Sequence, residues 1–186
     1  MSSAELGVAH PPRALGLWPL AFVVVHVGSR AVAGHPEDAL WLCHVADLLL
    51  ALGLLAKSPR LWAIGALWII WGTPLWLLDV AAGGVFRVTS LGTHIGACCV
   101  ALVAARQGTV PPGSHWRGIV GVWALLAVTR VVARPDGNMN LAFRVQEGWN
   151  RAFPSYVPYF AFVSALAWMT FFLAERLLRR RGRSGA

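Results

Sequence analysis

The stretch from Leu61 to Ala82 has the sequence LWAIGALWIIWGTPLWLLDVAA, with a single charged residue, Asp79, near its end. A helix needs about 20 mostly apolar residues to cross the hydrocarbon core of a bilayer. This stretch therefore predicts a transmembrane helix. Pro74 lies inside it, and because proline removes a backbone hydrogen bond we expect the helix to be broken or kinked there.

Apolar stretches of similar character lie on both sides of this one. They cover residues 15–33, 39–56, 90–105, 117–133 and 157–178. Short polar segments separate them, and one long connection, residues 135–156, precedes the last. The sequence thus predicts one all-α domain over residues 1–186, a polytopic membrane helical bundle with six transmembrane helices and a basic tail over 179–186.

Composition supports this class of protein. The chain has 186 residues, of which 57% are hydrophobic and 13% charged, and its mean hydropathy is +0.60. A soluble domain carries about 25% charged residues, so a soluble enzyme is disfavoured, as is a disordered chain. The net charge of +8 arises from arginines that flank the apolar stretches and gather in the tail. This distribution is typical of a membrane protein and disfavours nucleic-acid binding.

The cations also predict the orientation. More of them fall on the side of the N-terminus, the second and fourth connections and the C-terminus, so we expect both termini in the cytoplasm of a multi-pass protein of the inner (plasma) membrane. A cleaved signal peptide ending near Ala31-Val32-Ala33 is the alternative for the first stretch. His26, Ser29 and Arg30 interrupt the apolar core that such a signal needs.

Ionisable side chains at membrane depth are expensive and mark functional sites. His44, Asp47, Asp79 and His94 all fall in the predicted outer halves of their helices, on the side of the long connection. We therefore expect one outward-facing polar pocket. His26 stands alone in a valine-rich run, and we interpret it as a packed or cavity-lining residue.

His44 and Asp47 are three positions apart, so on a helix they share a face. A carboxylate that accepts from one imidazole nitrogen raises the basicity of the other, as a general base requires. A bridge between two helices is the structural alternative. Cys43 and Thr93 are the candidate nucleophiles and His94 a second acid–base group, whereas an inert buried cysteine and an interfacial histidine are the plainer interpretations.

The candidate substrate-binding residues lie in other segments. The Asn138 and Asn140 amides can stabilise an oxyanion or bind a headgroup, although the preceding Asp-Gly also fits a simple turn. Asp79, Trp71 and Trp149 complete this predicted set.

The order of these motifs resembles that of the YwaF-like family of bacterial integral membrane proteins, and it is similar to the related eukaryotic transmembrane acyltransferase that remodels ether phospholipids. The motifs are CHVAD at 43–47, Trp71-Gly72, Asp79, His94, Asn138-x-Asn140 and Trp149. The resemblance covers about residues 38–178 and implies six spans.

The eukaryotic members imply acyl transfer by a cysteine and a histidine, here Cys43 with His94 or His44. More distantly related androgen-induced hydrolases of fatty-acid esters imply a threonine and a histidine, for which Thr93 is available. This chain departs from the pattern by its small size and by the adjacency of Cys43 and His44. Neighbouring helical positions do not face each other, so Cys43 would need His94 as its base.

The leading hypothesis is a lipid acyltransferase or ester hydrolase whose partner is a membrane lipid of the outer leaflet. It assigns no metal ligand and identifies no cofactor. A haem- or metal-binding protein that uses His44 and His94, or His26, is one alternative. A non-enzymatic carrier or assembly protein is the other.

Overall fold

The computed structural model describes residues 10–183, with side chains up to residue 179, and this part of the chain contains helices and no strand. Its α-helices are α1 (Leu17–Val32), α2 (Leu42–Leu55), α3 (Pro59–Ala81), α4 (Ala97–Gln107), α5 (Ser114–Val132) and α6 (Tyr156–Arg183). Each coincides with a predicted apolar stretch, so the all-α prediction is confirmed. The predicted basic tail continues α6, and residues 184–186 lie outside the described part.

Three helical segments are long and apolar enough to cross a membrane: Arg13–Val32, Pro59–Ala81 and Tyr156–Arg179. Helix α2 is apolar but shorter. The six-span arrangement therefore stays a prediction. Helix α3 continues through Pro74 to Ala81, so the predicted break is wrong and the predicted kink stays a prediction.

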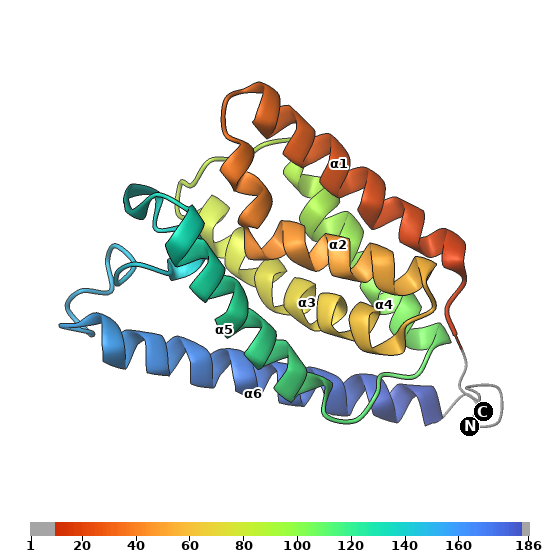
Figure 1. The fold of residues 1–186 in the computed structure, drawn as a ribbon. Coiled ribbons are helices and arrows are strands. Elements are labelled where there is room, and N and C mark those ends of the chain that lie inside the picture. The colour runs from red at the N-terminus through yellow and green to blue at the C-terminus, as the bar shows by residue number, and fades with distance from the viewer. Residues whose placement is uncertain (1–9, 184–186) are drawn as a thin grey trace.

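The helices alternate in direction, so α1 begins and α6 ends at the same end of the bundle (Figure 1). Short helices occupy the connections: η2 (Arg13–Gly16), η3 (Pro36–Leu40), η4 (Gly92–Gly96), η5 (Pro135–Gly137) and η6 (Met139–Leu141). The η4 turn is a π-helix that leads directly into α4. We call the end that holds η3, η4, η5 and η6 the loop end, and the opposite end the terminal end.

Helix α3 is the centre of the bundle. It contributes to both hydrophobic clusters, one shared mainly with α2 and α4 and the other with α5 and α6. Trp62 and Trp68 are almost fully buried, and the Trp68 indole donates to the Gly118 carbonyl of α5 at 3.0 Å. Four other helices thus pack around α3.

Glycines allow α2 and α3 to pack backbone against backbone. A Cβ atom on Gly65 would lie 2.5 Å from the Leu50 backbone nitrogen, and one on Gly53 would lie 2.1 Å from that of Trp62. These distances are well below van der Waals contact, so no larger residue fits without separating the helices.

At the terminal end, α6 closes the start of α5. The buried Glu175 carboxylate accepts from the Gly113 and His115 backbone amides at 3.0 and 2.9 Å, and from His115 Nδ1 at 2.7 Å. A carboxylate at this position satisfies amides that the first turn of a helix leaves free. The contact holds the ends of α5 and α6 together.

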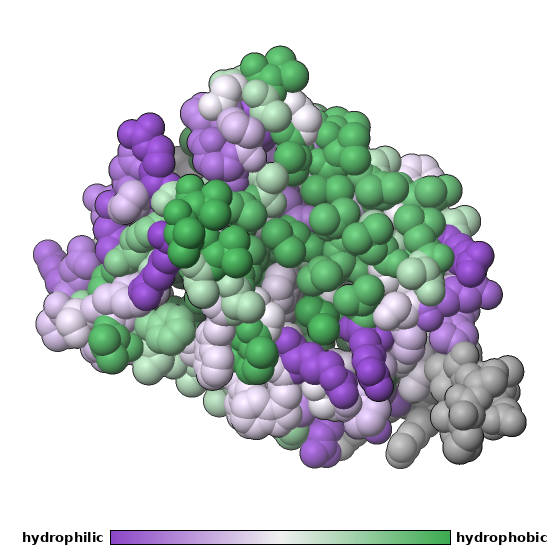
Figure 2. All heavy atoms as spheres, viewed as in Figure 1, coloured by the Kyte–Doolittle hydropathy of each residue, from purple (hydrophilic) through white to green (hydrophobic). Residues whose placement is uncertain are grey.

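Large apolar side chains cover much of the outer surface. Val24 and Val25 of α1, Leu78 of α3 and Val131 of α5 are each at least 60% exposed. Figure 2 shows hydrophobic side chains over the middle of the visible face, with hydrophilic ones gathered toward its ends. Exposed apolar surface of this extent suits contact with lipid.

The close contact between α2 and α3 generates the first prediction. Gly65→Ala forces the two helices apart, and overpacking of this kind costs about 1–3 kcal/mol. We expect a melting temperature several degrees below wild type for the detergent-solubilised protein, measured by the intrinsic tryptophan fluorescence.

Gly72→Ala is the matched control. Gly72 also lies in α3, but a Cβ there meets nothing within 4 Å. Alanine has the higher helix propensity, so this variant should melt at or slightly above the wild-type temperature. Equal melting temperatures for the two variants would contradict the close packing.

Candidate functional site

Three histidines from three segments meet at the loop end. His26 of α1, His44 of α2 and His94 of η4 are only 6%, 4% and 6% exposed. The rings of His26 and His44 lie with their centroids 4.8 Å apart and their planes at 49°. The η4 turn that carries His94 packs against both α1 and α2. We call these three residues the histidine cluster.

The turn before α2 orients His44. Its Nδ1–H donates to the backbone carbonyl of Asp38 at 2.6 Å. The Asp38 carboxylate in turn accepts from Arg30 at 2.5 Å and from the Trp41 indole at 3.1 Å, which fixes the turn. Because a carbonyl only accepts, Nδ1 carries the imidazole proton, and Nε2 is left with a free lone pair.

His94 is held in the same manner within its own segment. Its Nδ1–H donates to the Ser90 carbonyl at 2.9 Å, and its ring stacks on Trp76 of α3 at 4.4 Å between centroids. The Thr73 hydroxyl of α3 donates to the His94 carbonyl at 3.3 Å. His94 is therefore held by α3, through Trp76, on one side and by the Ser90 carbonyl on the other.

His26 has a different kind of partner. Its Nδ1 lies 2.7 Å from the hydroxyl of Thr89, which belongs to the connection before η4. A hydroxyl can donate as well as accept, so this imidazole nitrogen is free to be the acceptor. The charges of Arg30 and Arg87 act on the same ring. His26 thus belongs to the polar site, although the sequence indicated a packed or cavity-lining residue.

The hydrogen bond expected between His44 and Asp47 is not formed. Asp47 is fully buried, and neither carboxylate oxygen has a hydrogen-bond partner among the described residues. The Asp38 carbonyl takes the imidazole nitrogen that Asp47 was expected to bind. Asp47 therefore lies one helical turn deeper than His44 with its hydrogen-bonding capacity unused.

The two predicted nucleophiles differ in their contacts. The Thr93 hydroxyl is fully buried and donates to the Ser90 carbonyl at 3.2 Å; it is also 3.2 Å from His94 Nδ1. Within the described residues, no hydrogen bond joins the half-buried Cys43 thiol to an imidazole.

The two asparagines hold the loop end together. Asn140 donates to the Leu40 carbonyl at 2.7 Å and to the Thr129 hydroxyl at 3.1 Å, and it accepts from the Leu42 amide at 2.7 Å. Asn138 accepts from the amides of Phe143 and Arg144 and donates to the Arg144 carbonyl. Their amide groups are engaged in the contacts that fix the start of α2 and the connection between α5 and α6.

The remaining predicted substrate-binding residues are dispersed. Asp79 is exposed and lies beside Gly84 at the end of α3, whereas Trp71 is half-buried against the second hydrophobic cluster. Trp149 is 46% exposed and packs on Phe153 and Phe162. None of these three has a described hydrogen bond to the histidine cluster.

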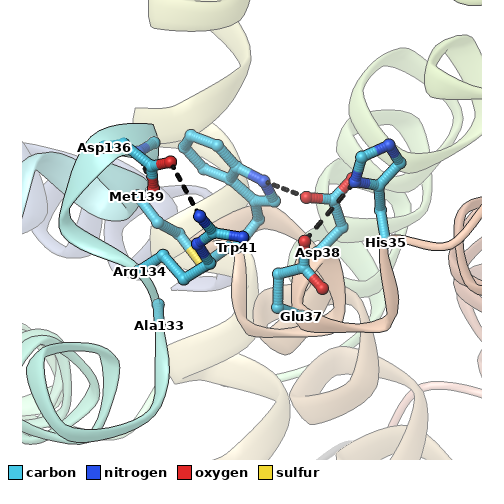
Figure 3. A pocket seen from close by; sticks show the side chains of 9 residues that line it. His35, Glu37, Asp38, Trp41, Ala133, Arg134, Asp136 and Met139 are labelled. Atoms are coloured by element: carbon cyan, nitrogen blue, oxygen red, sulfur yellow. Dashed lines mark hydrogen bonds and ion pairs between the residues drawn. The ribbon is translucent and has the colours of Figure 1, made fainter.

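An open cavity of about 420 Å³ lies at the loop end, between η3 and the segment after α5. Its lining includes Glu37, Asp38, Trp41, Arg134 and Asp136, and Figure 3 shows the Trp41 indole between the Asp38 carboxylate and the Arg134 guanidinium. Asp38 connects the two regions, because its carbonyl holds His44 while its side chain lines the cavity. The cavity therefore offers charges of both signs, and Asp38 is a lining residue that also binds the imidazole of a histidine of the cluster.

Metal binding by a group of side chains finds no geometric support here. Among residues 10–183, no three or more His, Cys, Asp or Glu residues are placed to hold a metal ion together. The arrangement instead presents imidazoles whose Nδ1 atoms are oriented and whose Nε2 atoms have no described hydrogen bond.

No family model, no curated protein and no solved structure matches the chain. The resemblance to the YwaF-like family therefore stays a prediction from the motifs.

Sequence reasoning missed Thr89 and Trp76 as neighbours of the site. Thr89 is 63 positions from His26, and no local pattern connects them. Trp76 and His94 are also far apart along the chain, so no local pattern predicts that their rings stack. A polar residue inside a run as apolar as that around His26 was the one available signal.

The hydrogen bonds predict the tautomers of the three histidines. In protein labelled with ¹⁵N on histidine and held at alkaline pH, where the rings are neutral, His44 and His94 should show protonated Nδ1. His26 should show protonated Nε2 if the Thr89 hydroxyl donates to its Nδ1, as its contact at 2.7 Å allows. Imidazole ¹⁵N chemical shifts, assigned with single His→Gln variants, measure this directly. A His44 ring protonated only at Nε2 would contradict the bond to Asp38.

Proposed function

We propose that this protein is a six-span plasma-membrane protein, with both termini in the cytoplasm, that catalyses acyl transfer or ester hydrolysis on a lipid of the outer leaflet. The observation that carries the proposal is the histidine cluster, three buried imidazoles brought together from α1, α2 and η4. Proton transfer, lipid access and headgroup binding each support it.

Proton transfer favours an enzyme over a purely structural cluster. Moving an acyl group between oxygens requires a proton to be removed from one alcohol or water and given to another, and histidine is the commonest side chain for this. His44 and His94 each direct Nδ1–H to a backbone carbonyl, which leaves Nε2 as an oriented proton acceptor. The site therefore holds more than one oriented imidazole that can take part in the proton transfers of acyl transfer.

Lipid access favours a membrane substrate. The histidine cluster lies at the loop end of helices whose outer surfaces carry exposed apolar side chains. A lipid whose acyl chains lie along these surfaces would bring its ester groups to the level at which apolar helices give way to polar loops. The excess of arginine and lysine at the opposite end supports an outward orientation of this site.

Headgroup binding favours a phospholipid. The cavity at the loop end is lined by the Glu37 carboxylate and by the exposed ion pair of Arg134 with Asp136, whose charged atoms lie 3.6 Å apart. Carboxylates attract an amine, and guanidinium groups bind phosphate oxygens in paired hydrogen bonds. Arg30 and Arg87, near His26, add positive charge on the side of the reacting groups.

The proposal predicts ester turnover that depends on the histidines. The protein in proteoliposomes of phosphatidylethanolamine and phosphatidylglycerol, with a trace of a phospholipid labelled in its acyl chain, should release labelled fatty acid or transfer it to an added lysophospholipid. Loss of a general base costs about 10²- to 10⁴-fold. His44→Ala and His94→Ala should each fall in this range, measured by chromatography of the labelled lipids.

His10→Ala is the matched control, since His10 precedes α1 at the terminal end. It should retain wild-type turnover, and each variant must keep the wild-type elution volume and melting temperature. Unchanged turnover in His44→Ala or His94→Ala would remove that residue from the mechanism. Wild-type protein that acts on no labelled phospholipid, with or without acceptor, would refute the proposed function.

A further inference from the structure

We propose that Thr89 is the catalytic nucleophile of this site and that His26 is its general base. The inference rests on the proposed function and deepens it, because it names the residue that receives the acyl group. Thr89 was not among the candidates that the sequence indicated, and His26 was indicated only as a packed or cavity-lining residue or as an alternative haem or metal ligand. The observation that carries it is the 2.7 Å contact between the Thr89 hydroxyl and His26 Nδ1.

A nucleophilic hydroxyl needs an imidazole nitrogen that can accept its proton, within about 2.6–3.2 Å. Thr89 and His26 meet this distance. His26 Nδ1 has no other described partner, and the Thr89 hydroxyl has none either. The hydroxyl can therefore donate to Nδ1, with the imidazole proton on Nε2. This is the tautomer that a general base requires before the reaction.

The rival Thr93 lacks an available base. Its nearest imidazole nitrogen is His94 Nδ1, which must keep its proton to donate to the Ser90 carbonyl at 2.9 Å. An imidazole nitrogen that already carries a proton has no lone pair left to accept one from a hydroxyl. The Thr93 hydroxyl also donates to that same carbonyl, so it is occupied.

The second rival, Cys43, needs a base that turns toward it. His44 follows it directly in α2, and its ring packs against His26 rather than on the cysteine. Neither His26, bound to Thr89, nor His94, bound to Ser90, has a described hydrogen bond to the thiol. Among the described hydroxyl and thiol groups near the histidine cluster, Thr89 alone contacts an imidazole nitrogen that is free to accept a proton.

The position of Thr89 also suits attack on a lipid ester. Thr89 is half-buried, whereas Thr93 is fully buried, so the former is within reach of a substrate that enters from the loop end.

The reaction balances with these two residues. Thr89 Oγ forms a bond to the ester carbonyl carbon while its proton passes to His26 Nδ1. The tetrahedral intermediate breaks its bond to the lipid alcohol oxygen, which takes that proton and leaves as a lysolipid. An acceptor alcohol, or water, then attacks the acyl-Thr89 ester, gives its proton to Nδ1, and releases Thr89 Oγ, which recovers it.

Covalent labelling tests the assignment. A fluorophosphonate probe bonds its phosphorus to an activated hydroxyl oxygen and releases fluoride, with the hydroxyl proton taken by the base. We expect wild-type protein in the same proteoliposomes to be labelled at Thr89. Trypsin cleavage after Arg87 and Arg106 places Thr89, Ser90 and Thr93 on one peptide, so fragment ions locate the label.

Variants separate the roles of the two residues. Thr89→Val, which keeps the side-chain shape, should abolish labelling and lower phospholipid turnover at least 100-fold, whereas Thr89→Ser should retain both. His26→Gln should lower labelling of the intact Thr89 to a similar extent. The control Thr109→Val lies in the connection between α4 and α5, at the terminal end, and should match wild type.

The outcomes distinguish this inference from the proposed function. Turnover that survives in a folded Thr89→Val protein would overturn the nucleophile and leave the proposed function standing. A label found on Thr93 or Cys43 would overturn it in the same manner. Wild-type protein that neither turns over phospholipid nor reacts with the probe would refute both.

Discussion

An imidazole buried at the polar end of an apolar bundle needs a hydrogen-bond partner, because the surroundings supply little water. Each histidine of the cluster meets this need differently. His44 donates to the carbonyl of a preceding turn, His94 donates to its own first turn, and His26 contacts a hydroxyl from a distant connection. The His26 contact joins α1 to the connection before η4, the His44 contact joins α2 to η3, and the differences among the three contacts set which nitrogen of each ring is left as an acceptor.

The rest of the fold brings these segments together. Glycines in α2 and α3 let the two backbones touch, so α2 packs directly against the central helix of the bundle. Asn140 then joins that start to α5 and to the final connection through three hydrogen bonds. At the other end, Glu175 closes the first turn of α5 against α6. The polar groups of the protein are thus concentrated at the two ends, and the apolar middle carries the helix packing.

Much of the helical layout could be predicted from the sequence, because uninterrupted apolar stretches have few alternatives to helix in a chain with so few charges. The placement of His44 and His94 at the same end of the bundle followed from alternating helix direction. The spacing of His44 and Asp47 predicted a hydrogen bond between them, but the sequence could not reveal the competing acceptor. That acceptor is the Asp38 carbonyl, which the η3 turn positions. His26 was underestimated because its partner Thr89 comes from another segment, and the asparagines because their partners in the loop end are backbone groups.

The proposed site requires His26 and His44 to lie close together, and disulfide cross-linking measures this proximity. In a background with Cys43, Cys98 and Cys99 replaced by serine, His26→Cys and His44→Cys are combined, and the protein is oxidised in proteoliposomes. Trypsin cuts at Arg30 and Lys57, so the peptides 14–30 and 31–57 should be recovered as one disulfide-linked species. The pair His26→Cys with His115→Cys, which places its thiols at opposite ends of the bundle, should stay unlinked. Failure of the first pair to link, in protein that keeps its wild-type elution volume, would contradict a shared site for the imidazoles of α1 and α2.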